Sequence, residues 1–153
     1  AFNSCMGPMP IYRCTLPDGF TFATSGMLRA NQTLRAIYGD VPFSVIGDLR
    51  EVNFGIFEMK SYEDLKTEPV YQDWLVPPGG ESFADSEARL LRGLDELLSR
   101  KDDTICVCHG GTILTAMANL FPEEGKDGYA WQPKPGFGYE IDLVNHVYLP
   151  ISG

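Results

Sequence analysis

The chain has 153 residues and a formal net charge of -9, with 44% hydrophobic and 22% charged residues. This length favours one domain with a sizeable buried core, so we expect a single domain over residues 1–153. The negative charge argues against a nucleic-acid-binding surface, no apolar run is long enough to span a bilayer, and the N-terminus has no signal-peptide pattern, so we expect a cytoplasmic protein that binds neither nucleic acid nor membrane.

The N-terminal segment 1–19 is rich in glycine and proline and is predicted to be irregular, apart from a short strand at Met9 to Cys14. An apolar strand is predicted over residues 20–23. The hydroxyl residues Thr24-Ser25 are predicted to cap the helix that follows, which runs from Met27 to Gly39.

A second short strand, Phe43 to Ile46, leads into a loop over residues 48–55 in which apolar and charged residues alternate. Such a mixture on a loop suggests a functional site. Ser61 is predicted to cap a short acidic helix, and Ser82 to begin a long amphipathic helix over Phe83 to Ser99. Apolar residues at three- and four-residue spacing predict its buried face, namely Ala84, Ala88, Leu91, Leu94 and Leu98.

Thr104 to Cys108 is a short apolar strand, which we expect in the middle of a covered parallel sheet. It ends at His109, followed by Gly110, Gly111 and a helix over Thr112 to Leu120. The glycines let the backbone approach a bound group, and the helix N-terminus presents unpaired N–H groups and the positive end of its dipole. The junction predicts an anion site; the alternative is a buried histidine bonded to a backbone carbonyl.

The segment from Phe121 to Gly138 is rich in glycine and proline and is predicted to be an ordered loop over the carboxyl ends of the strands. Its aromatic side chains would otherwise form an exposed patch of Tyr129, Trp131 and Phe137. Two strands, Tyr139 to Leu143 and Val147 to Ile151, end the chain. The alternation of strands and helices predicts an α/β sandwich with a mostly parallel sheet.

Four cysteines raise the alternative of a small thiol or metal protein. On a strand, Cys106 and Cys108 point to one face and His109 to the other, so these three side chains do not easily converge on one ion. A zinc site would need Cys5 and Cys14 to fold back onto this strand. We therefore predict no metal, and metal analysis of the purified protein separates the two alternatives.

Three motifs stand in order along the chain: Thr24 to Thr33, then Leu49 to Gly55 with Phe57-Glu58 after it, then Gly80-Glu81-Ser82 leading a helix to Cys108-His109-Gly110-Gly111. The first is similar to the family pattern Ser-Ser-x-x-x-Arg-Ala-x-Gln-Thr, and the second to Leu-Arg-Glu-x-x-Phe-Gly followed by Trp-Glu-Gly. The third is similar to Ser-His-Gly-Gly. Their order and spacing resemble the histidine phosphatase superfamily, which contains phosphoglycerate mutases and many small-molecule phosphomonoesterases.

The resemblance implies a three-layer α/β/α sandwich of the phosphoglycerate mutase type, a small phosphorylated substrate and no cofactor. Arg29 would bind the phosphoryl group, Glu51 would protonate the leaving oxygen, and His109 would stabilise the equatorial oxygens, with Gly110 in the phosphate site. The implied activity is phosphomonoester hydrolysis or phosphoglycerate mutase-like phosphoryl transfer on a small metabolite. The alternative, which residue type alone favours, is that Arg29 is a solvated helix residue and that Glu51 forms a surface ion pair with Arg50. The three-motif match reverses this preference.

The sequence departs from the family pattern at the nucleophile, a histidine in an Arg-His-Gly motif at the end of the first strand. The only histidines are His109 and His146. Cys14 is a candidate relic, although too few residues separate it from the strand at Phe20 for a parallel crossover. We expect an N-terminally incomplete copy or a variant without the nucleophile, and impaired turnover. The alternative is an inactive protein that binds a phosphorylated metabolite or a partner in the same pocket. Met59 also replaces the usual glycine.

Overall fold

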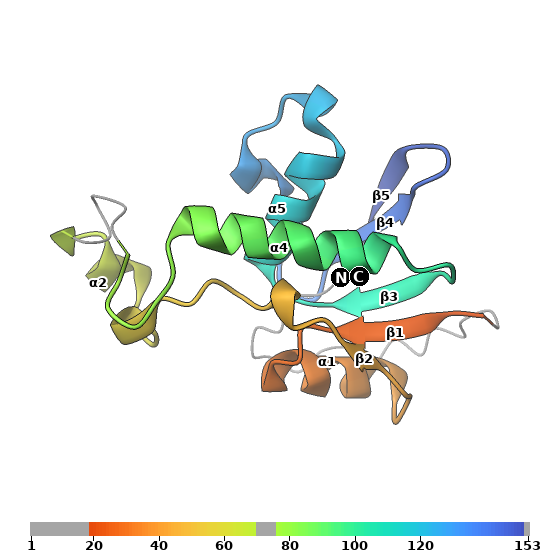
Figure 1. Ribbon diagram of the computed structural model, residues 1–153, viewed down its shortest axis with the longest axis horizontal. Helices are drawn as coiled ribbons and strands as arrows, with labels where there is room; N and C mark the ends of the chain where they lie inside the picture. The colour runs from red at the N-terminus through yellow and green to blue at the C-terminus, as the bar shows by residue number, and fades with distance from the viewer. Residues whose placement is uncertain (1–18, 70–75, 152–153) are drawn as a thin grey trace.

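A parallel sheet of three strands organises the described part of the chain (Figure 1). The structure is a computed structural model that describes residues 19–69 and 76–151. In it, β1 (Thr21–Thr24) lies between β2 (Ser44–Val45) and β3 (Thr104–Val107) and pairs in parallel with both. The carboxyl ends of the three strands therefore meet at one edge, which is where ligands bind in open α/β sheets.

The position of β3 differs from the sequence prediction. We expected this apolar strand in the middle of the sheet, but among the described strands β1 holds that place and β3 pairs with β1. The strand is apolar for another reason. Its successive side chains point to opposite faces of the sheet, and both faces are covered by helices, so side chains on either face meet a core. Cys106 packs in the core on one face, and Val107 packs in the core on the other.

Helices on both faces of the sheet give the three layers of an α/β/α sandwich (Figure 1). α1 (Leu28–Tyr38) lies on one face, where its Ala30 and Val107 belong to the same buried cluster. α4 (Phe83–Leu98) and α5 (Gly110–Leu120) lie on the other face. This arrangement confirms the predicted α/β sandwich with a mostly parallel sheet.

The start of α1 corrects the predicted cap. Its N-cap residue is Met27, and no side chain of the described residues forms a capping hydrogen bond. Thr24 instead accepts a hydrogen bond from the Gly26 N–H at 3.0 Å and donates one to Asn31 Oδ1 at 2.6 Å. Gly26 has φ +82, and a Cβ there would lie 2.6 Å from Val45 Cγ1, so the turn requires glycine. The hydroxyl groups before the helix therefore stabilise the turn after β1.

The start of α4 is as predicted, but its buried face is not. Ser82 Oγ accepts a hydrogen bond from the Asp85 N–H at 3.0 Å. Of the predicted apolar face, Leu94 is buried, Ala84 and Ala88 are exposed, and the other two leucines are half-buried. The buried residues are Ser86, Arg89, Leu90, Gly93 and Leu94. The helix turns this face toward the 3-10 turn η1 (Gly47–Leu49), and a Cβ on Gly93 would lie 2.9 Å from Leu49 Cδ2.

Between η1 and α4 the chain forms a 3-10 turn, η2 (Gly55–Phe57), and a short helix, α2 (Tyr62–Leu65). Ser61 Oγ accepts a hydrogen bond from the Asp64 N–H at 3.2 Å, which confirms the predicted cap. Met59 has φ 73, in the left-handed region that favours glycine. The glycine usual at this position in the family pattern suits the same backbone conformation.

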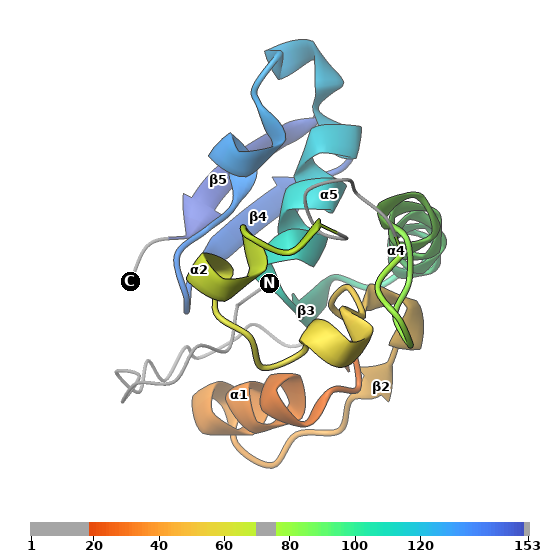
Figure 2. The same ribbon diagram turned by 90° about the vertical axis from the view of Figure 1, so that its left-hand side faces the viewer.

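The two predicted C-terminal strands are present as β4 (Gly138–Asp142) and β5 (Val147–Ile151), and they pair as an antiparallel hairpin. In Figure 2, α5 lies between α4 and this hairpin. Two 3-10 turns, η3 (Pro122–Glu124) and η4 (Gly128–Trp131), connect α5 to β4. The hairpin thus extends the core on the α5 side of the sheet.

The aromatic residues of this connection do not need to cover the site in order to be buried. Trp131 is 1% exposed, and its ring centroid lies 6.2 Å from that of Phe121, 5.9 Å from that of Tyr139 and 5.1 Å from that of Tyr148. Tyr129 is 73% exposed. The argument that an aromatic patch must cover the site was therefore wrong, because Trp131 is a core residue between α5 and the hairpin.

Some predictions concern residues outside the described ranges. They include most of the irregular segment 1–19, the strand at Met9 to Cys14 and the thiols of Cys5 and Cys14. Within the described ranges, no helix has the length and apolar character that crossing a membrane requires. The organisation of residues 1–153 as one domain stays a prediction.

Candidate active site

Two neighbouring strand ends bring Ser25 and His109 together at the carboxyl edge of the sheet. Ser25 directly follows β1, and its N–H donates to the Val107 carbonyl oxygen at the end of β3. Ser25 Oγ and His109 Nε2 share a hydrogen bond of 2.7 Å. Both side chains are buried, with exposed fractions of 3% and 0%. The parallel pairing of β1 with β3 therefore fixes the orientation of the His109 ring.

His109 is also the N-cap residue of α5, with its carbonyl oxygen accepting from the Ile113 N–H at 2.9 Å. Its other ring nitrogen, Nδ1, is buried and has no hydrogen-bond partner in the described part of the chain. Burial lowers the pKa of His109 to about 4, with a further contribution from the charge of Arg29. The ring is therefore neutral near pH 7. The alternative of a histidine bonded to a backbone carbonyl is wrong for Nε2, which bonds a hydroxyl group.

Arg29 lies in the first turn of α1 and is exposed. Its charge acts on two predicted site residues, lowering the pKa of His109 and opposing the rise in the pKa of Glu51. Within residues 19–69 and 76–151 the Arg29 guanidinium has no ion-pair partner. An unpaired guanidinium next to a helix N-terminus can bind an anion.

Glu51 follows η1, and its carboxyl group lies against the first turn of α5. A Cβ on Gly111 would lie 2.6 Å from Glu51 Oε1, so the glycine makes room for the carboxyl group. Burial raises the pKa of Glu51, while the Val52 N–H and the Arg29 charge oppose the rise. The expected ion pair with Arg50 is wrong, because Arg50 Nη1 lies 4.0 Å from Asp48 and donates to the Gly47 carbonyl.

The structure thus brings Arg29, Glu51 and His109, predicted from the sequence, to one edge of the sheet beside Gly110. A neutral imidazole, a carboxyl group that keeps its proton to higher pH, and an unpaired guanidinium meet there. The first-turn N–H groups of α5 add donors for an oxyanion. This set can bind a phosphate group and donate a proton to an ester oxygen.

Sequence reasoning missed two residues that hold this site, Arg89 on α4 and Thr112 on α5. Thr112 Oγ1 donates to the Leu49 carbonyl oxygen at 3.0 Å. Arg89 is 4% exposed and bonds three carbonyl oxygens of the turn that carries Glu51. A signal was present, because Leu90, Leu94 and Leu97 form a second apolar stripe at four- and three-residue spacing, and Arg89 lies beside it.

The cysteines near His109 are core residues. Cys106 and Cys108 are free thiols, buried on the α5 side of the sheet, whereas the His109 ring bonds Ser25. In the described ranges, no group of three or more His, Cys, Asp or Glu side chains is placed to hold a metal ion.

We expect the buried neutral His109 to make stability depend on pH. Its pKa is about 4 when folded against about 6.5 when unfolded, so the unfolded chain binds more protons between these values. The free energy of unfolding should therefore fall as the pH drops from 6.5 toward 4, by up to about 3 kcal/mol. Urea unfolding at pH 7 and pH 4.5 measures this change. His109→Gln should remove most of it, and an equal change in both proteins would contradict the prediction.

Comparisons with known proteins are consistent with this geometry. Residues 16–136 match the family model of the histidine phosphatase superfamily (branch 1). The adenosylcobalamin/alpha-ribazole phosphatase of Escherichia coli (strain K12) is 26% identical over 144 residues, which cover 84% of this chain and 71% of that protein. The enzyme of the same name from Salmonella typhimurium (strain LT2) is 28% identical over 131 residues, covering 78% of this chain and 65% of that protein.

Solved structures show the same architecture. The phosphoglycerate mutase from Thermus thermophilus superimposes with a TM-score of 0.67 at 27% identity, covering 92% of this chain and 77% of that chain. The alpha-ribazole phosphatase from Shigella flexneri has a TM-score of 0.67 at 24% identity, covering 86% and 71%, and at this identity it supports the fold alone.

Proposed function

The chain belongs to the histidine phosphatase superfamily, and from this premise we propose that it acts on the phosphomonoester of a small metabolite. The relatives from Escherichia coli and Salmonella typhimurium are phosphatases, which supports phosphatase or phosphomutase-like chemistry in this chain. The observation that carries the proposal is the meeting of an unpaired Arg29, a half-buried Glu51 with a raised pKa and a neutral His109 at one sheet edge. The names of the relatives make alpha-ribazole phosphate the first metabolite to test.

In the proposed mechanism, Arg29 binds the phosphoryl oxygens through its planar guanidinium. His109 and the N–H of Gly110 stabilise the equatorial oxygens as charge develops on them. Glu51 donates its proton to the leaving oxygen, a role that suits a carboxyl group whose pKa is raised by burial. This chemistry needs no metal and no organic cofactor. A cytoplasmic location remains part of the proposal.

In the family, a histidine nucleophile attacks the phosphoryl group and carries it covalently. His109 does not supply this nucleophile, because one ring cannot both attack in line and stabilise an equatorial oxygen. The other histidine of the 153 residues, His146, pairs with Glu123 next to the β4–β5 hairpin. Cys14 lies outside the described residues. We therefore propose that the isolated 153-residue chain binds phosphate but hydrolyses esters slowly. For the isolated 153 residues, the second candidate function is therefore the binding of a phosphorylated metabolite or partner without turnover.

A chromogenic phosphate ester, p-nitrophenyl phosphate, together with calorimetric titration of inorganic phosphate, tests the two candidates. Turnover that Glu51→Gln or His109→Asn reduces would support the enzyme, and phosphate binding without turnover would support the binding protein. Robust turnover abolished by Cys14→Ser would identify the thiol as the nucleophile. A chain that neither binds phosphate nor turns over esters would contradict both.

A further inference from the structure

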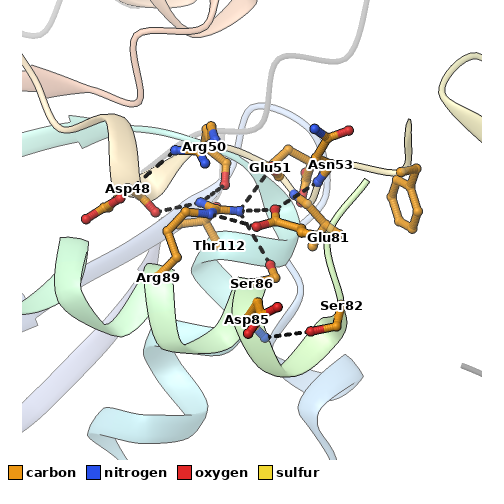
Figure 3. A network of polar contacts seen from close by, with 12 residues as sticks. Asp48, Arg50, Glu51, Asn53, Glu81, Ser82, Asp85, Ser86, Arg89 and Thr112 are labelled. Atoms are coloured by element: carbon orange, nitrogen blue, oxygen red, sulfur yellow. Dashed lines mark hydrogen bonds and ion pairs between the residues drawn. The ribbon is translucent and has the colours of Figure 1, made fainter. Parts of the chain in front are cut away.

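A buried arginine on α4 reaches the turn that carries Glu51 (Figure 3). Arg89 Nη1 donates to the carbonyl oxygens of Asp48 at 2.7 Å and Arg50 at 2.9 Å, and Nη2 donates to that of Glu51 at 3.4 Å. These acceptors belong to one short stretch of chain. The planar guanidinium therefore fixes the backbone from both sides of Arg50.

Among the described residues, the charge of Arg89 is compensated by the carboxylate of Glu81. Arg89 Nε donates to Glu81 Oε2 at 3.1 Å, and Nη2 donates to Glu81 Oε1. The hydrogen bonds from Arg89 are the main cause that lowers the pKa of Glu81, so the pair is ionised near pH 7. Glu81 Oε1 also accepts from the Asn53 N–H at 2.9 Å, two residues after Glu51. The ion pair thus holds the chain on both sides of Glu51.

The same turn is held from the other helix. Thr112 of α5 donates to the Leu49 carbonyl, and there is little space on either side. A Cβ on Gly93 of α4 would lie 2.9 Å from Leu49 Cδ2, and a Cβ on Gly111 of α5 would lie 2.6 Å from Glu51 Oε1. Both helices therefore approach the turn closely, and a larger residue at either glycine would push the helix and the turn apart.

We propose that Arg89 is a positioning residue for Glu51: its guanidinium fixes the turn from Asp48 to Glu51 so that the Glu51 carboxyl group stays packed against the first turn of α5. The inference rests on the proposed function, in which this carboxyl group is the proton donor. Loss of the guanidinium fork would let the turn loosen and the carboxyl group reach water. Arg89 does not itself touch the substrate.

The electrostatic surroundings of Glu51 define a readout for this role. Burial is the largest cause that raises its pKa, and the Glu58 charge also raises it, whereas the Val52 N–H, Arg29 and Arg89 lower it. A substitution that keeps a positive charge at position 89 but frees the turn should therefore affect the pKa of Glu51 mainly by reducing the burial of its carboxyl group. The pKa of Glu51 should then fall toward its ordinary value.

Arg89→Lys is the variant of choice, because an ammonium group keeps the charge next to Glu81 but cannot bond three carbonyls and a carboxylate in one plane. Arg92→Lys is the matched control: its side chain is on the same helix, is 65% exposed, and its Nε lies 3.6 Å from Asp48 Oδ2. The pKa of Glu51 is measured by nuclear magnetic resonance titration of its carboxyl carbon, assigned with Glu51→Gln. It should fall in Arg89→Lys and stay unchanged in Arg92→Lys.

The same samples are titrated with inorganic phosphate, which separates this inference from the proposed function. Affinity for phosphate should change by less than about twofold in Arg89→Lys, since Arg29 and His109 are untouched. If the wild type binds no phosphate while Arg89→Lys lowers the Glu51 pKa, the proposed function fails and the positioning role stands.

Glu81→Gln serves as the second variant, because it keeps Arg89 but removes the carboxylate that orients its fork. Its expected effect on Glu51 has the same direction. A Glu51 pKa equal to that of the wild type in whichever of the two variants folds would overturn the proposal, as would an equal shift in Arg92→Lys.

Discussion

Arg29→Gln is expected to weaken the binding of inorganic phosphate about 10- to 100-fold, the effect of removing a charge-assisted, two-pronged hydrogen bond. Arg29 has no ion-pair partner among the described residues, and its charge acts on both Glu51 and His109. In a chain with a net charge of -9, a phosphate group needs such a local cation. Calorimetric titration at pH 7 and constant ionic strength measures the change.

Arg35→Gln is the matched control for this experiment. Arg35 is exposed on the same helix, and its guanidinium carbon lies 5.7 Å from the centroid of the Phe43 ring. The variant changes the net charge by the same amount, so it measures any general electrostatic effect, and we expect less than a twofold change in affinity. Arg29→Lys should fall in between, because it keeps the charge but loses the planar fork. Equal affinities in Arg29→Gln and the wild type would remove Arg29 from the site.

Trp131→Ala is expected to lower the free energy of unfolding by about 3 to 5 kcal/mol, the range for removing a buried aromatic side chain. Trp131 is 1% exposed, packs against Phe121 and Tyr148, and has Lys126 Nζ 4.2 Å from its ring centroid. The Tyr139 hydroxyl also donates to the Trp131 carbonyl at 2.9 Å. Urea unfolding followed by far-ultraviolet circular dichroism measures the loss without depending on tryptophan fluorescence.

Tyr129→Ala provides the comparison within the same 3-10 turn. Tyr129 is 73% exposed, so its removal should change the free energy of unfolding by no more than about 0.5 kcal/mol. Similar losses in the two variants would mean that Trp131 does not belong to the core. Phosphate affinity should stay close to that of the wild type in both, because neither side chain belongs to the proposed phosphate site.

The sequence by itself determined features that depend on a few neighbouring residues. Ser82 and Ser61 begin helices because the hydroxyl group of each accepts a hydrogen bond from the backbone N–H three residues later, in the first turn of the helix. Gly39 ends α1 with φ 80, where a glycine is favoured. The resemblance of three motifs to the histidine phosphatase superfamily implied Arg29, Glu51 and His109 as a site, and their roles stay a prediction.

Only the tertiary structure decided which partner each polar side chain takes. Ser25 could have capped α1, and it bonds His109 instead, 84 positions away, because β3 pairs next to β1. Arg89 on α4 bonds carbonyl oxygens of the turn from Asp48 to Glu51, about 40 positions earlier in the chain. A local pattern shows which hydrogen bonds a side chain is able to form. The choice among them depends on burial and on groups that the chain brings near only when it folds.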